Sequence, residues 1–236
     1  MPNEWFKYEE KSAQTISAFL SLIVDDPKAP YLFRGHADLD WELEPKIDRS
    51  DFSGLRGNLT REDHERLVFE EFKRLALPHL HSRPANNWEF LALAQHHGAP
   101  TRLLDWTENP LAALFFAVAP ARADDGAVWC YTCVGMEDPL DSEHNPDPLS
   151  LDRIVLFRPP HVDPRISAQS GMFTVHPSNF KSLKDAWGCP LTRVRIPFAA
   201  RARLRLQLQR LGVHRASLFP DLDGVGQHVY ELWRND

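Results

Sequence analysis

The chain has 236 residues, 43% of them hydrophobic, which is enough to bury a full core and favours one large domain over two small ones. Its formal net charge of -6 at pH 7 argues against a protein whose whole surface follows a phosphate backbone, so nucleic acid is not the expected partner. No apolar run approaches the roughly 20 residues needed to span a bilayer, and the N-terminal residues lack the order of a signal peptide, so we expect a cytoplasmic protein with no membrane partner.

Hydrophobic spacing and cap residues predict that helices and strands alternate along the first half of the chain. Thr60 is a good N-cap for a helix that runs to Pro78, because its side chain can accept from the free amides that follow. Asn109 and Pro110 are typical of another helix start, since proline lacks an amide that the first turn does not need. The predicted elements are a helix within residues 12–26, a strand at 30–35, helices at 60–78 and 87–97, a short strand from Thr101 and a helix from Asn109.

The second half continues the alternation, with a strand at 126–134, short stretches at 153–157 and 165–177, a strand at 191–198, an amphipathic helix at 201–212 and a last helix after 218–224. These elements predict an α+β fold, a single domain with a mixed, mainly antiparallel sheet core flanked by helices. Within that domain, residues 1–30 are expected to form an N-terminal helical extension and residues 136–152 a surface insertion.

Cysteine and histidine spacing argues against a metal site. The three cysteines are too few for a disulfide framework. Cys130 and Cys133 lie three apart in a predicted strand, where their side chains point to opposite faces, so we expect core cysteines. Adjacent His96 and His97 sit about 100° apart around a helix and cannot clamp one ion. No metal is therefore expected.

The stretch from Thr101 to Thr107 is polar on both faces of the strand that it predicts. Asp105 lies on one face and Arg102 on the other, and burying either charge without a partner costs several kcal/mol. One explanation is an internal Arg102–Asp105 salt bridge that holds the loop before the next helix. The other is that this stretch forms one wall of a binding site, together with Gln95 and His96 just before it.

A second polar cluster ends the predicted strand at 30–35. Arg34, Gly35 and His36 come at its end, with Trp41 shortly after. An arginine beside a glycine suits a bidentate grip on phosphate or carboxylate, with Gly35 letting the ligand approach the backbone. The alternative is that Arg34 bridges to a nearby acidic residue.

A third polar cluster lies at residues 165–171. It contains Arg165, Gln169, Ser170 and Gly171. Three polar clusters on different elements predict one site that is assembled in space.

Several motifs together resemble the FRG domain family of bacterial proteins. They are "FRG" at 33–35, the spacing of Trp41, Leu43 and Pro45, "QHHGAPTRLLDWT" at 95–107, the pattern of the following helix, and "LFPDLDG" at 218–224. The resemblance runs from about Tyr31 to Val229.

The same segments show a more distant similarity to ADP-ribosyltransferases. There a first strand carries an arginine or histidine that holds NAD, a second strand precedes a patterned helix, and a later strand supplies a glutamate. Arg34 and residues 101–117 occur in that order, but Gln169 stands nearest to the place of the glutamate. Later acidic candidates are Asp221, Asp223 and Glu231. The similarity implies NAD as a substrate and no tightly bound cofactor.

The similarity also implies roles for the site residues, with electrostatic stabilisation of positive charge on the ribose as the underlying chemistry. Arg34 and Arg102 would hold the pyrophosphate, and Asp105 or Gln169 would face the ribose. Thr101 and Thr107 would orient the site, and Trp106 or Trp41 would stack on a ring. The predicted catalytic residues are Arg34, Asp105 and Gln169. The predicted ligand-binding residues are Arg34, Gly35, His36, Trp41, Gln95, His96, Thr101, Arg102, Trp106 and Thr107.

Three functions stay open from the sequence. The first is an NAD-consuming enzyme, either a transferase or a glycohydrolase. The second is a non-enzymatic module that binds a nucleotide or another phosphorylated ligand in the same pocket. The third is an effector that acts on nucleic acid, supported by the basic helix at 201–210, whose leucines also fit an ordinary helix with one buried face. No protein acceptor is evident.

Overall fold

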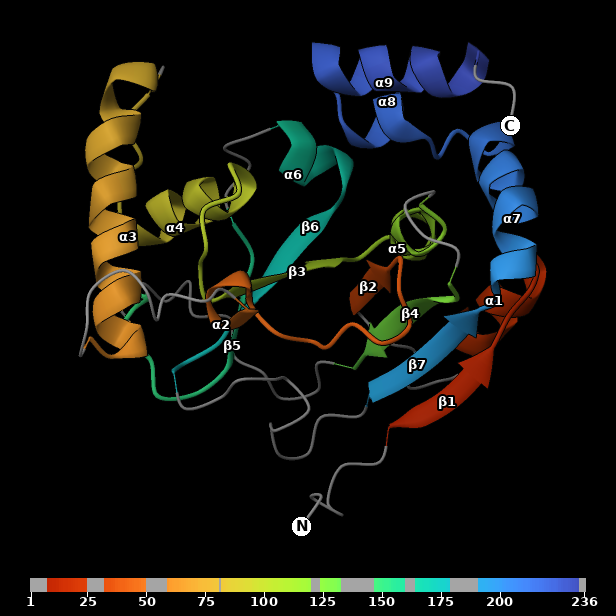
Figure 1. Cartoon of the computed structure of the whole chain (residues 1–236), viewed down its shortest axis with the longest axis horizontal. Helices are drawn as coiled ribbons and strands as arrows, with labels where there is room; N and C mark the ends of the chain where they lie inside the picture. The colour runs from red at the N-terminus through yellow and green to blue at the C-terminus, as the bar shows by residue number, and fades with distance from the viewer. Residues whose placement is uncertain are drawn as a thin grey trace.

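The computed structural model describes residues 8–24, 32–49, 59–80, 82–119, 124–132, 147–159, 164–178 and 191–233. Within these ranges seven strands form one sheet in the order β1-β7-β4-β2-β3-β6-β5 (Figure 1). The strands are β1 Glu9–Ser12, β2 Leu32–His36, β3 Leu103–Thr107, β4 Gly126–Tyr131, β5 Val155–Phe157, β6 Gly171–Val175 and β7 Leu191–Ile196. Only the β1/β7 pair among them is parallel, so the predicted α+β fold with a mixed, mainly antiparallel sheet is confirmed.

The long helices form where the cap signals and hydrophobic spacing predict them. The Thr60 side chain accepts from the amide of Asp63 and closes a capping box, and Asn109 accepts from Leu111 and Ala112. These helices are α1 Ile16–Val24, α3 Arg61–Ala76, α4 Asn87–His96, α5 Pro110–Ala117, α7 Phe198–Arg210 and α9 Leu222–Trp233. The sequence did not predict the short helices α2 Lys46–Arg49, α6 Pro164–Ala168 and α8 Arg215–Leu218, or the 3-10 turn η1 Leu77–His79.

The N-terminal region contains the predicted helix but also a strand that was not predicted. β1 precedes α1 and pairs with β7, so residues 9–12 belong to the sheet and are not part of a helical extension. Its four residues, EEKS, are mostly charged and exposed, as suits an edge strand, and they carry no apolar alternation. Of the predicted insertion, residues 136–146 lie outside the described part of the chain.

The sheet is divided between β2 and β3. These two strands pair only at Phe33 and Thr107, whereas β2 pairs with β4 over five positions. One apolar cluster surrounds Phe33 and Val128 on one half, and another surrounds Leu103 and Phe173 on the other. A third cluster joins the two halves, since it contains residues of β2 and β4 as well as of β3 and β6. Figure 1 shows α1 and α7 at the β1/β7 end and α3 and α4 at the β5/β6 end. No helix in the described ranges is long and apolar enough to cross a membrane.

Candidate functional site

A pocket of about 280 Å³ opens where β2 and β3 separate. Its lining comes from β2, β3, α5, the turn before β6 and the segment between α8 and α9. The polar lining residues are Arg34, Asp105, Thr107 and Gln169, and the others are Phe33, Gly35, Trp106, Phe116 and Phe219. The three polar clusters of the sequence therefore each place a residue at this pocket. A larger hollow of about 740 Å³ lies between α3 and α4, and no predicted site residue lines it.

Arg34 bridges the two halves of the sheet. Its Nη1 donates to the backbone oxygen of Asp105 at 2.7 Å, and the two side chains form an ion pair at 3.4 Å. Its Nε donates to Nε2 of His36 at 2.9 Å. Among the described residues, none accepts a hydrogen bond from Nη2 of Arg34. Burial lowers the pKa of Arg34, and the Asp105 carboxylate opposes that shift. Nη2 is therefore a donor nitrogen available to a ligand.

A chain of hydrogen bonds holds the Asp105 carboxylate from behind. Gln95 donates from Nε2 to Oδ2 of Asp105 at 2.9 Å and accepts from Oγ1 of Thr101 at 2.5 Å. The Thr101 oxygen in turn accepts from the amide of Leu103. Gln95 and Thr101 thus support the site without lining the pocket. The Asp105 side chain is 55% exposed, and its Oδ1 accepts from no described residue.

Gln169 lies in the turn between α6 and β6 and is fixed at several points. Its backbone oxygen accepts from Oγ1 of Thr107, and its amide nitrogen Nε2 donates to the backbone oxygen of Leu218 at 3.0 Å. Ser170, the next residue, has a positive φ of 47°, which lets the chain turn sharply into β6. Gln169 thus lines the same pocket as Arg34 and Asp105.

An aromatic wall completes the pocket and was missed by the sequence analysis. The rings of Phe116 and Phe219 meet edge to face at 6.1 Å. Arg165 and Arg215 each lie 5.4 Å from the Phe219 ring, and Arg165 also pairs with Asp221. The motif at 218–224 contains Phe219, but it was interpreted only as part of the resemblance to the FRG domain family.

The later acidic candidates do not line this pocket. Asp221 accepts from the amide of Gly224, and that bond, together with Arg165, lowers the pKa of its carboxyl. Glu231 pairs with Arg215 at 2.9 Å. Asp223 is exposed on α9.

His36 and the tryptophans take structural roles. His36 is buried, accepts from Arg34 and has Nδ1 3.2 Å from the backbone oxygen of Trp41, so it orients the guanidinium. Trp41 lies edge to face with His36 and does not line the pocket. Trp106 borders the pocket, but its indole is buried against Tyr131 and donates to Thr174. The prediction that one of these tryptophans stacks on a ligand ring gains no support from this geometry.

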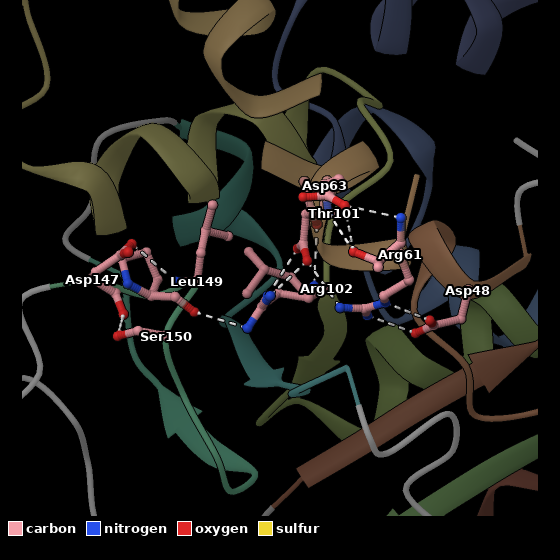
Figure 2. A network of polar contacts seen from close by, with 12 residues as sticks. Asp48, Arg61, Asp63, Thr101, Arg102, Asp147, Leu149 and Ser150 are labelled. Atoms are coloured by element: carbon pink, nitrogen blue, oxygen red, sulfur yellow. Dashed lines mark hydrogen bonds and ion pairs between the residues drawn. The ribbon is translucent and has the colours of Figure 1, made fainter. Parts of the chain in front are cut away.

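Arg102 points away from the pocket, so its predicted phosphate-binding role is wrong. It forms a bidentate ion pair with Glu65 of α3 at 2.8 and 2.6 Å, and both side chains are buried. The alternative Arg102–Asp105 bridge is therefore also wrong. Glu65 is shared with Arg61, which holds Asp48 of α2, and Figure 2 shows Arg102 between this group and residues 147–150. The network fastens α2 and α3 to the start of β3.

Gly35 lines the pocket, but its lack of a side chain is required by helix packing. A Cβ at this position would lie 1.9 Å from the backbone oxygen of Ala113 and 2.8 Å from the nitrogen of Ala117. The absence of a side chain at Gly35 therefore allows α5 to pack closely against β2.

His96 lies at the end of α4 with its ring against His97 and does not line the pocket.

The metal and cysteine expectations concern residues away from the pocket. No group of three or more His, Cys, Asp or Glu side chains within the described ranges is arranged to hold a metal ion. Cys130 is a buried core residue as predicted, and burial raises the pKa of its thiol to about 12. Cys133 lies outside the described residues.

The buried His176, beside Arg102 at the end of β6, makes stability depend on pH. Burial lowers its pKa to about 3, and Arg61, Arg34 and Arg102 add to the shift. As the pH falls, His176 binds a proton near pH 6.5 in the unfolded chain, whereas in the folded chain it stays neutral at that pH. The free energy of unfolding should therefore fall by about 1.4 kcal/mol per pH unit below pH 6.5 from this residue alone. Urea titrations at pH 6.5 and 5.5 should show that the free energy of unfolding changes less with pH for His176→Gln than for the natural chain. An equal change in both proteins would contradict the assignment of this pH dependence to His176.

Residues 29–126 match the FRG domain. No curated protein and no solved structure matches the chain. The matched segment contains Arg34, Asp105 and Phe116, whereas Gln169 and Phe219 come from later in the chain.

Proposed function

We propose that the FRG domain at residues 29–126, completed by the turn before β6 and the segment after α8, binds a nucleotide of the NAD type at the split between β2 and β3. The observation that carries this proposal is the open Nη2 of Arg34, a partly buried cation that lines a pocket with aromatic walls. Guanidinium groups bind phosphate and carbonyl oxygens, and aromatic walls favour flat rings.

The size of the pocket limits how the ligand enters. Pockets that bury a drug-sized ligand enclose roughly 300–1,000 Å³. At about 280 Å³ this pocket accommodates a ring with part of its ribose, and the rest of a dinucleotide would lie over the rim. The similarity to ADP-ribosyltransferases also supports the proposal, because Arg34 on β2 and the segment that contains β3, which carry it, lie on neighbouring strands of the sheet.

NAD hydrolysis is a second candidate function, favoured by the open Oδ1 of Asp105. When the bond between nicotinamide and ribose breaks, the electron pair leaves with nicotinamide and positive charge develops on the sugar. A carboxylate beside the ribose stabilises that charge, and water then adds to the sugar and releases a proton. The Gln169 carboxamide cannot remove a proton from an acceptor as a glutamate would. This difference favours hydrolysis over transfer.

The geometry of α7 gives little support to nucleic-acid action. Leu204 and Leu208 are buried in the core, and Arg201 is buried with its guanidinium donating to backbone oxygens, including that of Ala37. At least one arginine of the basic helix is therefore structural.

Substitution of Arg34 tests the binding proposal. Isothermal titration with NAD should show binding to the natural chain and at least tenfold weaker binding to Arg34→Met, because the open donor and its charge are lost. Arg34→Lys keeps the charge and should fall between the two. Arg210→Met, an exposed change on α7, is the matched control. Unchanged affinity in a folded Arg34→Met protein would overturn the proposal.

Nicotinamide release tests the second candidate. If hydrolysis occurs, Asp105→Asn should reduce the rate of release from NAD by at least tenfold while NAD still binds, since a neutral amide stabilises the charged ribose less well. Chromatographic measurement of nicotinamide checks this. Binding without release by the natural chain would leave a nucleotide-binding module and remove the hydrolase.

A further inference from the structure

We infer that the pocket recognises a primary carboxamide, with Nη2 of Arg34 donating to its carbonyl oxygen and Oε1 of Gln169 accepting from its amide nitrogen. This inference rests on the proposed function and specifies the part of the ligand that enters the pocket. It makes Gln169 a residue that determines specificity, whether or not the ligand is cleaved.

The orientation of the Gln169 amide follows from its partner. The backbone oxygen of Leu218 only accepts hydrogen bonds, so the Gln169 NH₂ group must face it, as the 3.0 Å contact from Nε2 has it. Leu218 is itself buried and ends α8, whose capping box involves His214 and Ser217. The carbonyl that orients Gln169 is therefore held in place by the folded C-terminal segment.

The remaining end of the amide is available to a ligand. Oε1 of Gln169 makes no hydrogen bond to any described residue, and Gln169 lines the pocket. The backbone is pinned as well, because its oxygen accepts from Thr107 and its nitrogen donates to the oxygen of Arg165. The pocket thus presents a fixed acceptor from Gln169 and a fixed donor from Arg34.

One donor and one acceptor together match an amide and not an acid. A primary carboxamide supplies an acceptor oxygen for Arg34 and a donor nitrogen for Gln169. A carboxylate supplies two acceptors, so one of its oxygens would face Oε1 with no proton between them. Polar groups left unpaired in this way discriminate strongly between ligands. NAD should therefore bind more tightly than its nicotinic acid analogue, although Arg34 alone would favour the acid.

The test compares two ligands in each protein. Titrations with NAD and with nicotinic acid adenine dinucleotide should give the natural chain at least a tenfold preference for NAD. Gln169→Met keeps a side chain of similar length without the acceptor, and the preference should disappear or reverse. Gln227→Met, an exposed change on α9, should keep it. The ratio within one protein is the readout, so a uniform loss of affinity from a looser C-terminal segment does not affect it.

The outcomes separate this inference from the proposed function. Equal binding of both dinucleotides to the natural chain, or a preference that survives in Gln169→Met, would overturn carboxamide recognition while leaving nucleotide binding intact. Failure of both dinucleotides and of ADP-ribose to bind the natural chain would overturn the proposed function itself. Titrations with free nicotinamide and free nicotinic acid add a check that involves no phosphate. Nicotinamide should bind the natural chain more tightly than nicotinic acid.

Discussion

Gly35→Ala should lower the free energy of unfolding by more than about 3 kcal/mol. The new Cβ would lie 1.9 Å from the backbone oxygen of Ala113, and backbone atoms cannot move aside as a flexible side chain can. Helix α5 would have to shift off β2, which moves Phe116 in the pocket wall at the same time. Urea unfolding followed by circular dichroism measures the loss, and ligand binding should weaken in whatever protein stays folded.

Gly226→Ala is the matched control for this change. Gly226 lies within α9, and a Cβ there has no atom within 4 Å. Alanine should stabilise the helix by about 0.5–1 kcal/mol. If Gly35→Ala proved as harmless as Gly226→Ala, the close packing of α5 on β2 would be wrong.

Glu65→Ala should lower the free energy of unfolding by about 3–5 kcal/mol. The change leaves the buried guanidinium of Arg102 without its bidentate partner, and the remaining contact to the backbone oxygen of Pro148, at 3.3 Å, does not neutralise the charge. Arg61 loses one partner but keeps Asp48. Chemical denaturation of the purified variant measures this effect.

A paired substitution tests the same explanation. Glu65→Met with Arg102→Met removes both buried charges together, and replacing a buried ion pair with apolar side chains of similar size is often neutral. The double variant should recover most of the lost stability. A double variant less stable than Glu65→Ala would contradict the view that the cost comes from the unpaired charge.

Local patterns were sufficient to predict most of the fold. The Thr60 and Asn109 caps and the spacing of apolar residues act within a few positions of the chain, so the helices that they start could be read directly. The apolar run that ends at Arg34 likewise predicted β2 and one residue of the site. β1 carries no such signal, because it has no apolar alternation and its partner β7, which also pairs Arg193 with Glu10, lies far along the chain.

The partners of the polar residues depend on the folded chain and could not be read locally. Arg102 pairs with Glu65, which lies 37 residues earlier, and nothing in the polar stretch around Arg102 indicates that choice over Asp105. The split between β2 and β3 has the same origin, since strand pairing beyond Phe33 and Thr107 is a property of the whole sheet. Phe219 joins the pocket only because the C-terminal segment folds back against α5 and α6.

The most direct test is a crystal structure of the chain with NAD. We expect the nicotinamide ring beside Phe116 and Phe219 in the split between β2 and β3, with an oxygen of the ligand within hydrogen-bond distance of Nη2 of Arg34. NAD bound elsewhere, for instance in the hollow between α3 and α4, with no ligand atom near Arg34, would contradict this account of the site.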